Sequence, residues 1–532
     1  MAAGNLGATT VHAPTGMVAT ADHLASSAGV AALRAGGSAA DAAVAAGAVL
    51  AVTNQHQCGM GGDLFAVVHE PGQAVTALCA AGRAGSGSDS QQARAEGLDR
   101  LPFHGDVRAV TVPGCVDGWL ALHRRYGRLP LSQVLEAAIT YSATGFPVSR
   151  LLAATAPAIL ELDGAEDYLH PAMAAGGRLR AGTLIRRPGV AGALGKIVAD
   201  GRNGFYRGPF GEGLLRLGAG LFSQEDLDRS QAEWVEPLKV SVWGHDVLTP
   251  PPPSQGYLTL AAAAVAEGLD LPDDPADPAW PHLLAEAARA VGRDRDKVLA
   301  DGADGAALLD ATRLDAALAA VDPERRATIA PLAAGGGTTV CCAVDRARMG
   351  VTLIQSNASG WGAHLIEPAT GIFLHDRGIG FRLEHGHPAE LAPGRRPPHT
   401  LAPAILVRPD GSLRAVVGTM GGDSQPQIVL QVLARLLVHG QAPGRAVGEA
   451  RWALGSSGGF QTWEGGGPGF LAIEAHAAPE WDEGLAARGH EVRRSLHAID
   501  HAFGHTQVIE ATDGVLSGVA DPRALDGAAA GY

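Results

Sequence analysis

The sequence predicts an α+β protein built as a four-layer αββα sandwich, in which helices cover the outer faces of two stacked β-sheets. Two observations lead to this fold class. Ala-rich, apolar helical patterns fill much of the chain before residue 333 and return in shorter stretches near the C-terminus. After the Ala-Ala-Gly-Gly-Gly break at 333–337, short runs of β-branched residues alternate with turns. Strands flanked by helices on both sides can bury their apolar faces by packing in layers.

The N-terminal region begins with two helices and a strand. Asp22 is placed to cap a helix that ends at Gly36-Gly37. Ser38, with Asp41 three residues later, predicts a capping box for a second helix. That helix is apolar on nearly all sides, so it should be buried. A glycine-rich turn then leads into a strand over residues 64–69.

The remaining elements follow from periodicity and turn signals. Helices are expected in four stretches: about 110–210, 257–330, 426–440 and 445–452. Two hairpins are expected after the break, 338–344 with 350–355 and 405–407 with 413–417, followed by a last strand pair over 506–519. Weak strand alternation marks 235–250, and Pro250–Gly256 should be a rigid extended segment.

The composition of the 532-residue chain excludes several classes of function. A net charge of −14 and a pI near 5.8 argue against a nucleic-acid or membrane-surface binder. Apolar runs stay shorter than a membrane span and the N-terminus lacks the pattern of a secretory signal, so a cytoplasmic location is expected. The five cysteines lack metal-type spacing, and we expect neither a metal nor another cofactor.

The segment Gly335-Gly336-Gly337-Thr338-Thr339 lies where the sequence changes from helical patterns to β-branched runs. A threonine hydroxyl is a poor nucleophile without an adjacent base, and the α-amine of an N-terminal threonine is such a base, with a pKa of about 7.7–8.0. Thr338 gains that amine only if the Gly337–Thr338 bond is cut. The glycines let the backbone reach a strained geometry in which the hydroxyl attacks the preceding carbonyl. Flexible linkers contain similar runs, so the motif alone leaves both interpretations open.

Motifs along the rest of the chain favour the cleavage interpretation. In chain order they are Gly16–Thr20, Gly36–Ala45, Gly59–Asp63, Thr111–Gly114, Tyr126-Gly127, Leu129-Pro130, Pro250–Gly256, Gly418–Asp423, Asp521–Asp526 and Ala530–Tyr532. In order and spacing they resemble the γ-glutamyltransferase family of N-terminal nucleophile hydrolases, from about residue 15 to Tyr532. The resemblance implies that this chain has the αββα sandwich fold of N-terminal nucleophile hydrolases.

The resemblance also implies a precursor that cleaves itself before Thr338. Residues 1–337 would become a large subunit and residues 338–532 a small subunit, and the two would stay associated in one interlocked body. A further homo-oligomer is left open. Thr338 would attack an amide carbonyl, form an acyl-enzyme and pass the acyl group to water or an amine. Gly421 and Gly422 would supply the backbone N–H groups of an oxyanion hole.

Three more residues fall at or near family positions around the substrate. Arg83 occupies the place of an arginine that grips the donor's α-carboxylate, and its planar guanidinium suits that group. Thr339 would support the nucleophile from behind. Asn357 lies near the family's asparagine on the next strand, but the register differs by one residue and Ser356 competes for the place.

Departures from the family pattern bear on the substrate. Where γ-glutamyl enzymes hold the donor's α-ammonium with a glutamine and an aspartate, this chain has Arg377 and Gly380. A cation there repels an ammonium unless Asp376 or Glu384 compensates it, or unless Arg377 points to solvent. His399-Thr400 replaces a pair of serines and still offers side-chain donors in a different geometry.

This pattern is closer to an outlying branch of the family that includes glutaryl-cephalosporin acylases, oxamate-type amidohydrolases and glutathione-hydrolase-like proteins. We therefore expect an autoprocessing amidohydrolase acting on a small-molecule amide whose acyl group carries a carboxylate, γ-glutamyl or related. An oxamate-type amidohydrolase or a glutaryl-cephalosporin-type acylase without γ-glutamyl activity is the alternative. A non-catalytic relative that binds a ligand and stays uncleaved is a third, disfavoured by the intact junction and Gly421-Gly422.

Overall fold

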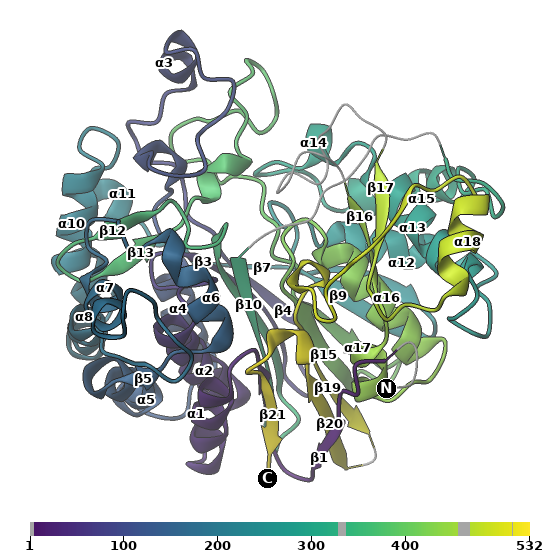
Figure 1. Ribbon diagram of the computed structural model, residues 1–532, viewed down its shortest axis with the longest axis horizontal. Helices are drawn as coiled ribbons and strands as arrows, with labels where there is room; N and C mark the ends of the chain where they lie inside the picture. Colours follow the sequence, from purple (N-terminus) through teal and green to yellow (C-terminus); the bar gives the residue numbers. More distant parts are fainter. Residues whose placement is uncertain (1–4, 328–336, 456–468, 513) are drawn as a thin grey trace.

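Two antiparallel β-sheets lie face to face in the middle of the molecule, and helices cover the outer face of each (Figure 1). The computed structural model describes residues 5–327, 337–455, 469–512 and 514–532. Apolar side chains from both sheets, among them Phe65, Val340 and Ile509, form a core between the sheets. The predicted αββα sandwich is therefore confirmed.

The first sheet has the strand order β21-β2-β10-β11-β3-β4-β7. In chain order these strands are β2 (Met17–Thr20), β3 (Asp63–His69), β4 (Thr76–Ala80), β7 (Glu233–Val235), β10 (Gly337–Val344), β11 (Gly350–Ala358) and β21 (Ala528–Gly531). The second sheet has the order β1-β20-β19-β15-β14-β9-β8. Its strands are β1 (Val11–Ala13), β8 (Leu238–Val242), β9 (His245–Thr249), β14 (Ala404–Val407), β15 (Leu413–Thr419), β19 (Thr506–Thr512) and β20 (Val515–Ala520).

Helices from different parts of the chain form the two outer layers. The first sheet is covered by α1 (His23–Arg34), α2 (Ala39–Thr53), α4 (Cys115–Tyr126), α5 (Leu131–Thr144) and α8 (Pro188–Asp200). The second is covered by α12 (Tyr257–Glu267), α13 (Ala279–Gly292), α16 (Gln425–Leu437) and α17 (Pro443–Gly448).

Shorter elements surround this frame. The helices are α3 (Ser90–Ala95), α6 (Arg150–Thr155), α7 (Glu166–Ala174), α9 (Arg202–Tyr206), α10 (Pro209–Leu217), α11 (Gln224–Asp228), α14 (Arg295–Val298), α15 (Ala311–Leu318) and α18 (Glu480–Ala487). The strands are β5 (Phe146–Pro147), β6 (Leu184–Ile185), β12 (Leu365–Glu367), β13 (Ile372–Leu374), β16 (Trp452–Gly455), β17 (Phe470–Ile473) and β18 (Val492–Arg494).

Local sequence signals account for the elements that lead to the first sheet. The Asp22 side chain accepts the N–H of Leu24 at 2.8 Å and caps α1. Ser38 and Asp41 form the predicted capping box of α2. Every residue of α2 is buried, because the helix packs between the first sheet and neighbouring helices. Both predicted hairpins after residue 337 and the last strand pair are also present.

Strands from the two sides of the Gly337–Thr338 bond pair with one another in both sheets. β10 pairs with β2 on one edge and with β11 on the other, and β11 pairs with β3. In the second sheet, β14 pairs with β9 and β20 pairs with β1. Each of the two segments therefore completes sheets begun by the other.

Two predicted elements differ from the structure. The helix expected over 445–452 is the shorter α17, and Trp452–Gly455 instead forms β16, whose pairing with β17 buries it. The segment Pro250–Gly256 contains turns before α12 rather than one extended run, because Ser254 and Gln255 turn back to bond with 399–401. Among the helices of the described ranges, none is long and apolar enough to cross a membrane.

Candidate active site

Thr338 is the second residue of β10, at the end of the strand that follows directly from the predicted cleavage site. Side chains alternate along a strand, so Thr338 points with Val340 into the space between the sheets. Thr339 points with Cys341 toward the helices on the other face. Both threonines are buried. Thr339 therefore lies on the face of β10 away from Thr338.

Ser356 lies directly opposite Thr338 in the register of β10 and β11. Its Oγ is 3.1 Å from Thr338 Oγ1, donates to the Gly337 carbonyl oxygen at 2.6 Å, and accepts the N–H of Ala358 at 2.9 Å. The register shifts between Gly337 and Thr338, so the bond joining them lies at a bulge. One hydroxyl thus links the candidate nucleophile to the carbonyl that it would attack.

Asn357 faces the other way from Ser356. Its Nδ2 donates to the carbonyl of Gln55 at 2.9 Å, and its backbone N–H donates to the carbonyl of Gln57 at 3.0 Å. Of the two residues that the sequence left in competition, Ser356 is therefore the one in contact with Thr338. Asn357 instead ties the end of β11 to the loop after α2.

Arg377 begins the short helix η4 (Arg377–Gly380) and is buried, with 2% of its surface exposed, so it does not point to solvent. Its Nη2 donates to Ser356 Oγ at 3.3 Å, and its Nε has no hydrogen-bond partner. Burial lowers the pKa of Arg377, and the longer-range charges of Asp63 and Asp376 offset part of that effect. Among the described residues, no carboxylate forms an ion pair with it. An unpaired buried cation is costly, and an anionic ligand would relieve that cost.

Asp63, the first residue of β3, forms a buried polar cluster with His375 and His399. Its Oδ2 is 3.2 Å from His399 Nε2 and 3.4 Å from His375 Nδ1, and its Oδ1 accepts the N–H of Gly82 at 2.9 Å. Burial alone would raise the pKa of Asp63, but these partners bring it to about 2. Burial and the charge of Arg377 lower the pKa of His399 to about 3, so this ring is neutral at pH 7.

Gly421 and Gly422 form the turn between β15 and α16, with φ angles of 138° and 55° that favour glycine. Three successive carbonyls here each accept a side-chain donor: Met420 O from Thr419 Oγ1 at 2.8 Å, Gly421 O from Ser424 Oγ at 2.7 Å, and Gly422 O from Gln255 Nε2 at 3.0 Å. Gln255 Nε2 also donates to the carbonyl of Thr400 at 3.1 Å. This amide joins the turn to the His399-Thr400 segment.

Arg83 bonds through its guanidinium to residues outside the cluster of Asp63, His375 and His399. Its guanidinium is 3.4 Å from Glu233 Oε2 and 3.5 Å from Gln231 Oε1, and Arg396 binds the same Glu233 oxygen at 2.9 Å. The neighbouring Gly82 N–H bonds to Asp63, which places the Arg83 backbone beside the polar cluster. The carboxylate-binding role of Arg83 stays a prediction.

Comparison with known proteins identifies the family. The profile of the γ-glutamyltranspeptidase family matches residues 25–532. The chain belongs to the γ-glutamyltranspeptidase family. It is 35% identical to the oxamate amidohydrolase proenzyme of Klebsiella pneumoniae over 97% of this chain and 98% of that protein. It is 33% identical to the glutathione hydrolase-like YwrD proenzyme of Bacillus subtilis, with 97% and 98% covered. A solved structure, cephalosporin acylase from Bacillus halodurans, is 31% identical, covers 98% of this chain and 97% of its own, and has a TM-score of 0.88.

Sequence reasoning singled out Thr338, Arg377 and the glycine turn of this γ-glutamyltranspeptidase-family chain as candidates, but not the polar side chains in the same region. Ser356 was only an alternative, and neither Asp63 nor Gln255 was singled out. Strand alternation could have favoured Ser356, because a hairpin partner on the same face must carry a side chain near Thr338. The contact of Asp63 with His399 and that of Gln255 with Gly422 each span more than a hundred residues, so periodicity carries no signal for them.

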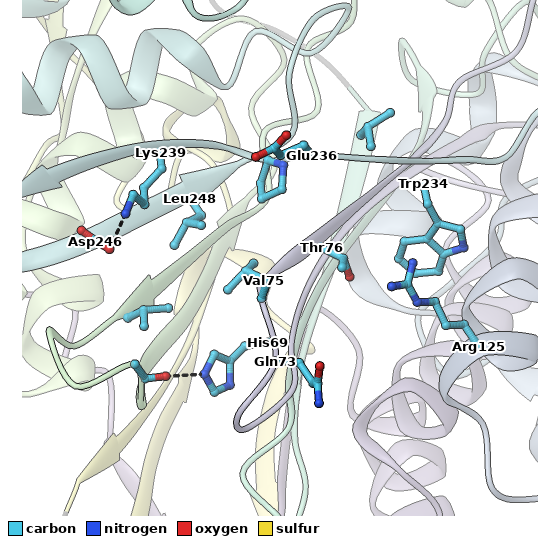
Figure 2. A pocket seen from close by; sticks show the side chains of 15 residues that line it. His69, Gln73, Val75, Thr76, Arg125, Trp234, Glu236, Lys239, Asp246 and Leu248 are labelled. Atoms are coloured by element: carbon cyan, nitrogen blue, oxygen red, sulfur yellow. Dashed lines mark hydrogen bonds and ion pairs between the residues drawn. The ribbon is translucent and has the colours of Figure 1, made fainter.

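A cavity of about 660 Å³ lies at the other end of β3 from Asp63 (Figure 2). It is lined by His69, Thr76, Arg125, Trp234 and Lys239 among others, and Arg125 stacks over the Trp234 ring at 4.5 Å. Since β3 has 7 residues, this cavity is roughly 20 Å from the Thr338 end of the sheet. It is separate from the candidate active site of this γ-glutamyltranspeptidase-family chain.

One buried group elsewhere has the residue types of a metal site. His282, Glu286 and His490 bring three ligand atoms within 4.8 Å of one another. The two histidines bond to each other at 2.8 Å, however, and Glu286 is paired with Arg289 at 3.0 Å. These groups already satisfy one another, and an adjacent guanidinium opposes a bound cation.

Proposed function

We propose that this chain is an autoprocessing amidohydrolase in which Thr338, freed by cleavage of the Gly337–Thr338 bond, hydrolyses amides of short acyl groups that carry a carboxylate. The observation that carries the proposal is Arg377, a buried guanidinium that pairs with no carboxylate in the described part of the chain and lies one hydroxyl away from Thr338. The similarity to an oxamate amidohydrolase proenzyme supports the same substrate class, because oxamate is a two-carbon amide with an adjacent carboxylate.

The distances limit the length of the acyl group. Arg377 Nη2 and Thr338 Oγ1 both contact Ser356 Oγ, at 3.3 and 3.1 Å, so they are at most two hydrogen bonds apart. A carbonyl carbon poised for attack lies roughly 3–3.5 Å from the nucleophile, and a carboxylate oxygen lies about 2.7–2.9 Å from a guanidinium nitrogen. Those two contacts alone take up most of the span, so the acyl group must lie across the line between the two groups, and a short one with one or two C–C bonds of about 1.5 Å fits best. The three-carbon chain of a γ-glutamyl or glutaryl group is longer.

Cleavage would begin with attack of Thr338 Oγ1 on the Gly337 carbonyl carbon. Ser356 Oγ accepts the hydroxyl proton while it passes its own proton to the Gly337 carbonyl oxygen, to which it already donates, so the serine stays neutral. That proton returns through Ser356 when the tetrahedral intermediate collapses. The peptide C–N bond then breaks, the nitrogen takes up the proton, and the Gly337 acyl group is left as an ester on Thr338. Water hydrolyses the ester, which frees the hydroxyl and the α-amine of Thr338.

Turnover would use the new α-amine as the base. It accepts the Thr338 hydroxyl proton while Oγ1 attacks the substrate carbonyl, and the same proton goes to the departing amine. The N–H groups of Gly421 and Gly422 would stabilise the oxyanion. Water or an acceptor amine then releases the acyl group. Arg377 would hold the substrate carboxylate throughout, so the amide carbonyl stays in line with Oγ1.

A longer donor is the second candidate, because the relatives include glutathione hydrolase-like and acylase proenzymes. The carboxylate of a γ-glutamyl or glutaryl donor would bind Arg83, the residue that the family resemblance suggests for that group. The guanidinium of Arg83 is engaged by Gln231 and Glu233, so such a donor would compete with that ion pair. We expect longer donors to be poorer substrates.

Cleavage is tested by intact mass and N-terminal sequencing of the purified protein. We expect two chains, the second beginning at Thr338, and a single uncleaved and inactive chain for Thr338→Ala. The interlocked sheets should keep the two chains together without denaturant. A full-length wild-type chain that persists on incubation would refute the nucleophile assignment.

The substrate class is tested by amine release from oxamate, malonamate, glutaramate and a γ-glutamyl anilide. We expect the two shortest donors to be preferred and Arg377→Met to lower kcat/KM for them by about 30-fold or more, since losing one partner of a buried charge pair costs about 2–5 kcal/mol. Arg216→Met, at a largely exposed arginine, is the control. A preference for the γ-glutamyl anilide, or full oxamate activity in Arg377→Met, contradicts the proposal.

A further inference from the structure

The hydroxyl groups of Thr506 and Thr419 form a chain that ends on the glycine turn. The two threonines are paired across β19 and β15, and their Oγ1 atoms are 3.0 Å apart. Thr419 Oγ1 donates to the Met420 carbonyl oxygen at 2.8 Å. A hydroxyl has only one proton to donate. Because Thr419 uses its proton on Met420, Thr506 is the donor in the bond between the two hydroxyls.

The accepting carbonyl is significant because of the peptide unit to which it belongs. The Met420 carbonyl and the Gly421 N–H lie in one planar unit. A hydrogen bond to that carbonyl therefore restrains the direction of the Gly421 N–H and polarises it. The next unit is restrained in the same way, because the Gly421 carbonyl accepts Ser424 Oγ at 2.7 Å and Ser424 N–H at 3.0 Å. That unit carries the Gly422 N–H.

Thr506 is itself held from the C-terminal part of the chain. Its N–H donates to Asp521 Oδ2 at 2.7 Å, and Arg451 and Arg523 bind the two oxygens of the same carboxylate at 2.7 and 3.1 Å. All four residues are buried. Burial alone would raise the pKa of Asp521, but these partners bring it to about 2, so the carboxylate is charged at pH 7. The anchor is therefore rigid and needs no contact with substrate.

We propose that Thr506 is a positioning residue for catalysis, acting through Thr419 on the peptide unit that presents the Gly421 N–H to the oxyanion. Ser424 has the same role for the Gly422 N–H. This inference rests on the proposed function, because it assigns a role to the oxyanion turn of that mechanism. It extends the candidate machinery to residues that contact neither the nucleophile nor Arg377 in the described structure.

A turn of two glycines needs such restraint. Glycine has the widest conformational freedom of any residue, so the N–H directions of Gly421 and Gly422 are set by bonds from outside the turn. An oxyanion donor acts only when it lies about 2.7–3.1 Å from the oxygen that develops charge. Loosening the Met420 carbonyl should therefore reduce the rate of the chemical step more than the affinity for the ground-state amide.

The test compares Thr506→Val, Thr506→Ser and Thr352→Val, each assayed as cleaved enzyme on its best amide. Thr352 is a matched control, because its buried hydroxyl donates to the Ala404 carbonyl at 2.9 Å in the middle of the two-sheet core. We expect Thr506→Val to lower kcat about tenfold, less than the ~10²–10³ for a deleted oxyanion donor. KM should stay within about twofold, Thr506→Ser should restore kcat, and Thr352→Val should leave it unchanged.

The outcomes separate this inference from the proposed function. A cleaved, active wild type with equal kcat in Thr506→Val and Thr352→Val overturns only the positioning role, as does a loss in Thr506→Val that serine does not restore. A wild type inactive on every amide overturns both. If Thr506→Val does not fold, Ser424→Ala is measured instead. It removes only the Oγ bond to Gly421, and an unchanged kcat there overturns the inference.

Discussion

The hydrogen bond from Ser356 to the Gly337 carbonyl leads to a quantitative prediction for the rate of cleavage. Ser356→Ala removes the donor that lies 2.6 Å from the oxygen on which charge would develop. It also removes the oxygen, 3.1 Å from Thr338 Oγ1, that would receive the hydroxyl proton. Loss of one oxyanion donor costs about 2.7–4 kcal/mol, or ~10²–10³ in rate. The charge of Arg377 remains next to the place of the deleted Ser356 hydroxyl. We therefore expect the rate of cleavage to fall by about 10²-fold, the lower end of that range.

The assay follows conversion of the full-length chain to segments 1–337 and 338–532 on denaturing gels, from the moment of purification. Ser356→Thr keeps the hydroxyl and should cleave within about tenfold of the wild type. Ser142→Ala is the matched control, because Ser142 also donates to a backbone carbonyl at 2.7 Å but lies in α5, away from Thr338. If Ser356→Ala is cleaved as fast as Ser142→Ala, the hydroxyl takes no part in cleavage and the relay is wrong.

Four further predictions concern pH, backbone and charge. Activity should rise through pH 7.7–8.0, where the α-amine of an N-terminal Thr338 loses its proton, and a kcat/KM that is flat from pH 6 to about pH 9 would contradict an amine base. Gly421→Ala should lower kcat at least tenfold, because a partly misdirected oxyanion donor loses part of its roughly 10²–10³-fold effect. A Cβ at this position would lie 2.8 Å from Ser424 Oγ, at a φ of 138° that side chains rarely adopt. The folded-state pKa of Asp63 is about 2 against an ordinary 3.8, so its charge adds roughly 2–3 kcal/mol of stability above pH 4 that is lost as the pH falls toward 2. Urea unfolding of Asp63→Asn in the uncleaved Thr338→Ala background should show that difference at pH 7 and a smaller one at pH 3. Asp521→Asn should cost about 3–5 kcal/mol because it removes the carboxylate paired with the buried Arg451, whereas Arg523 keeps its pair with Glu474, and an unchanged melting temperature would refute that account.

Much of the fold could be predicted because its signals are local. Asp22, Ser38 and Asp41 predict the starts of the first two helices, because their side chains form capping bonds to groups within three residues. After residue 337, the strand propensity of the β-branched runs and the turn residues between them predict the hairpins. The helix expected over 445–452 was too long because Trp452 pairs with Ile473 in β17, a contact that no local pattern encodes.

The candidate site was less predictable than the fold. A motif could indicate Thr338, Gly421 and Arg377, since each occupies a recognisable place in the chain. Whether Arg377 faces solvent or the surroundings of Thr338 depends on how η4 packs against β11, and the structure buries it beside Ser356. The choice between Ser356 and Asn357 depends on a register difference of one residue, which turns a strand side chain to the opposite face.

The sequence by itself determined the alternation of helical and strand segments and the family to which the chain belongs, and it predicts the junction at Gly337–Thr338. Those properties depend on neighbouring residues and on the order of motifs along the chain. Only the tertiary structure decided which side chains lie next to Thr338, because Ser356 and, behind it, Arg377 arrive there from separate segments. The physical reason is that a local signal sets backbone conformation within a few residues, whereas proximity between distant residues is set by sheet register and by the packing of layers.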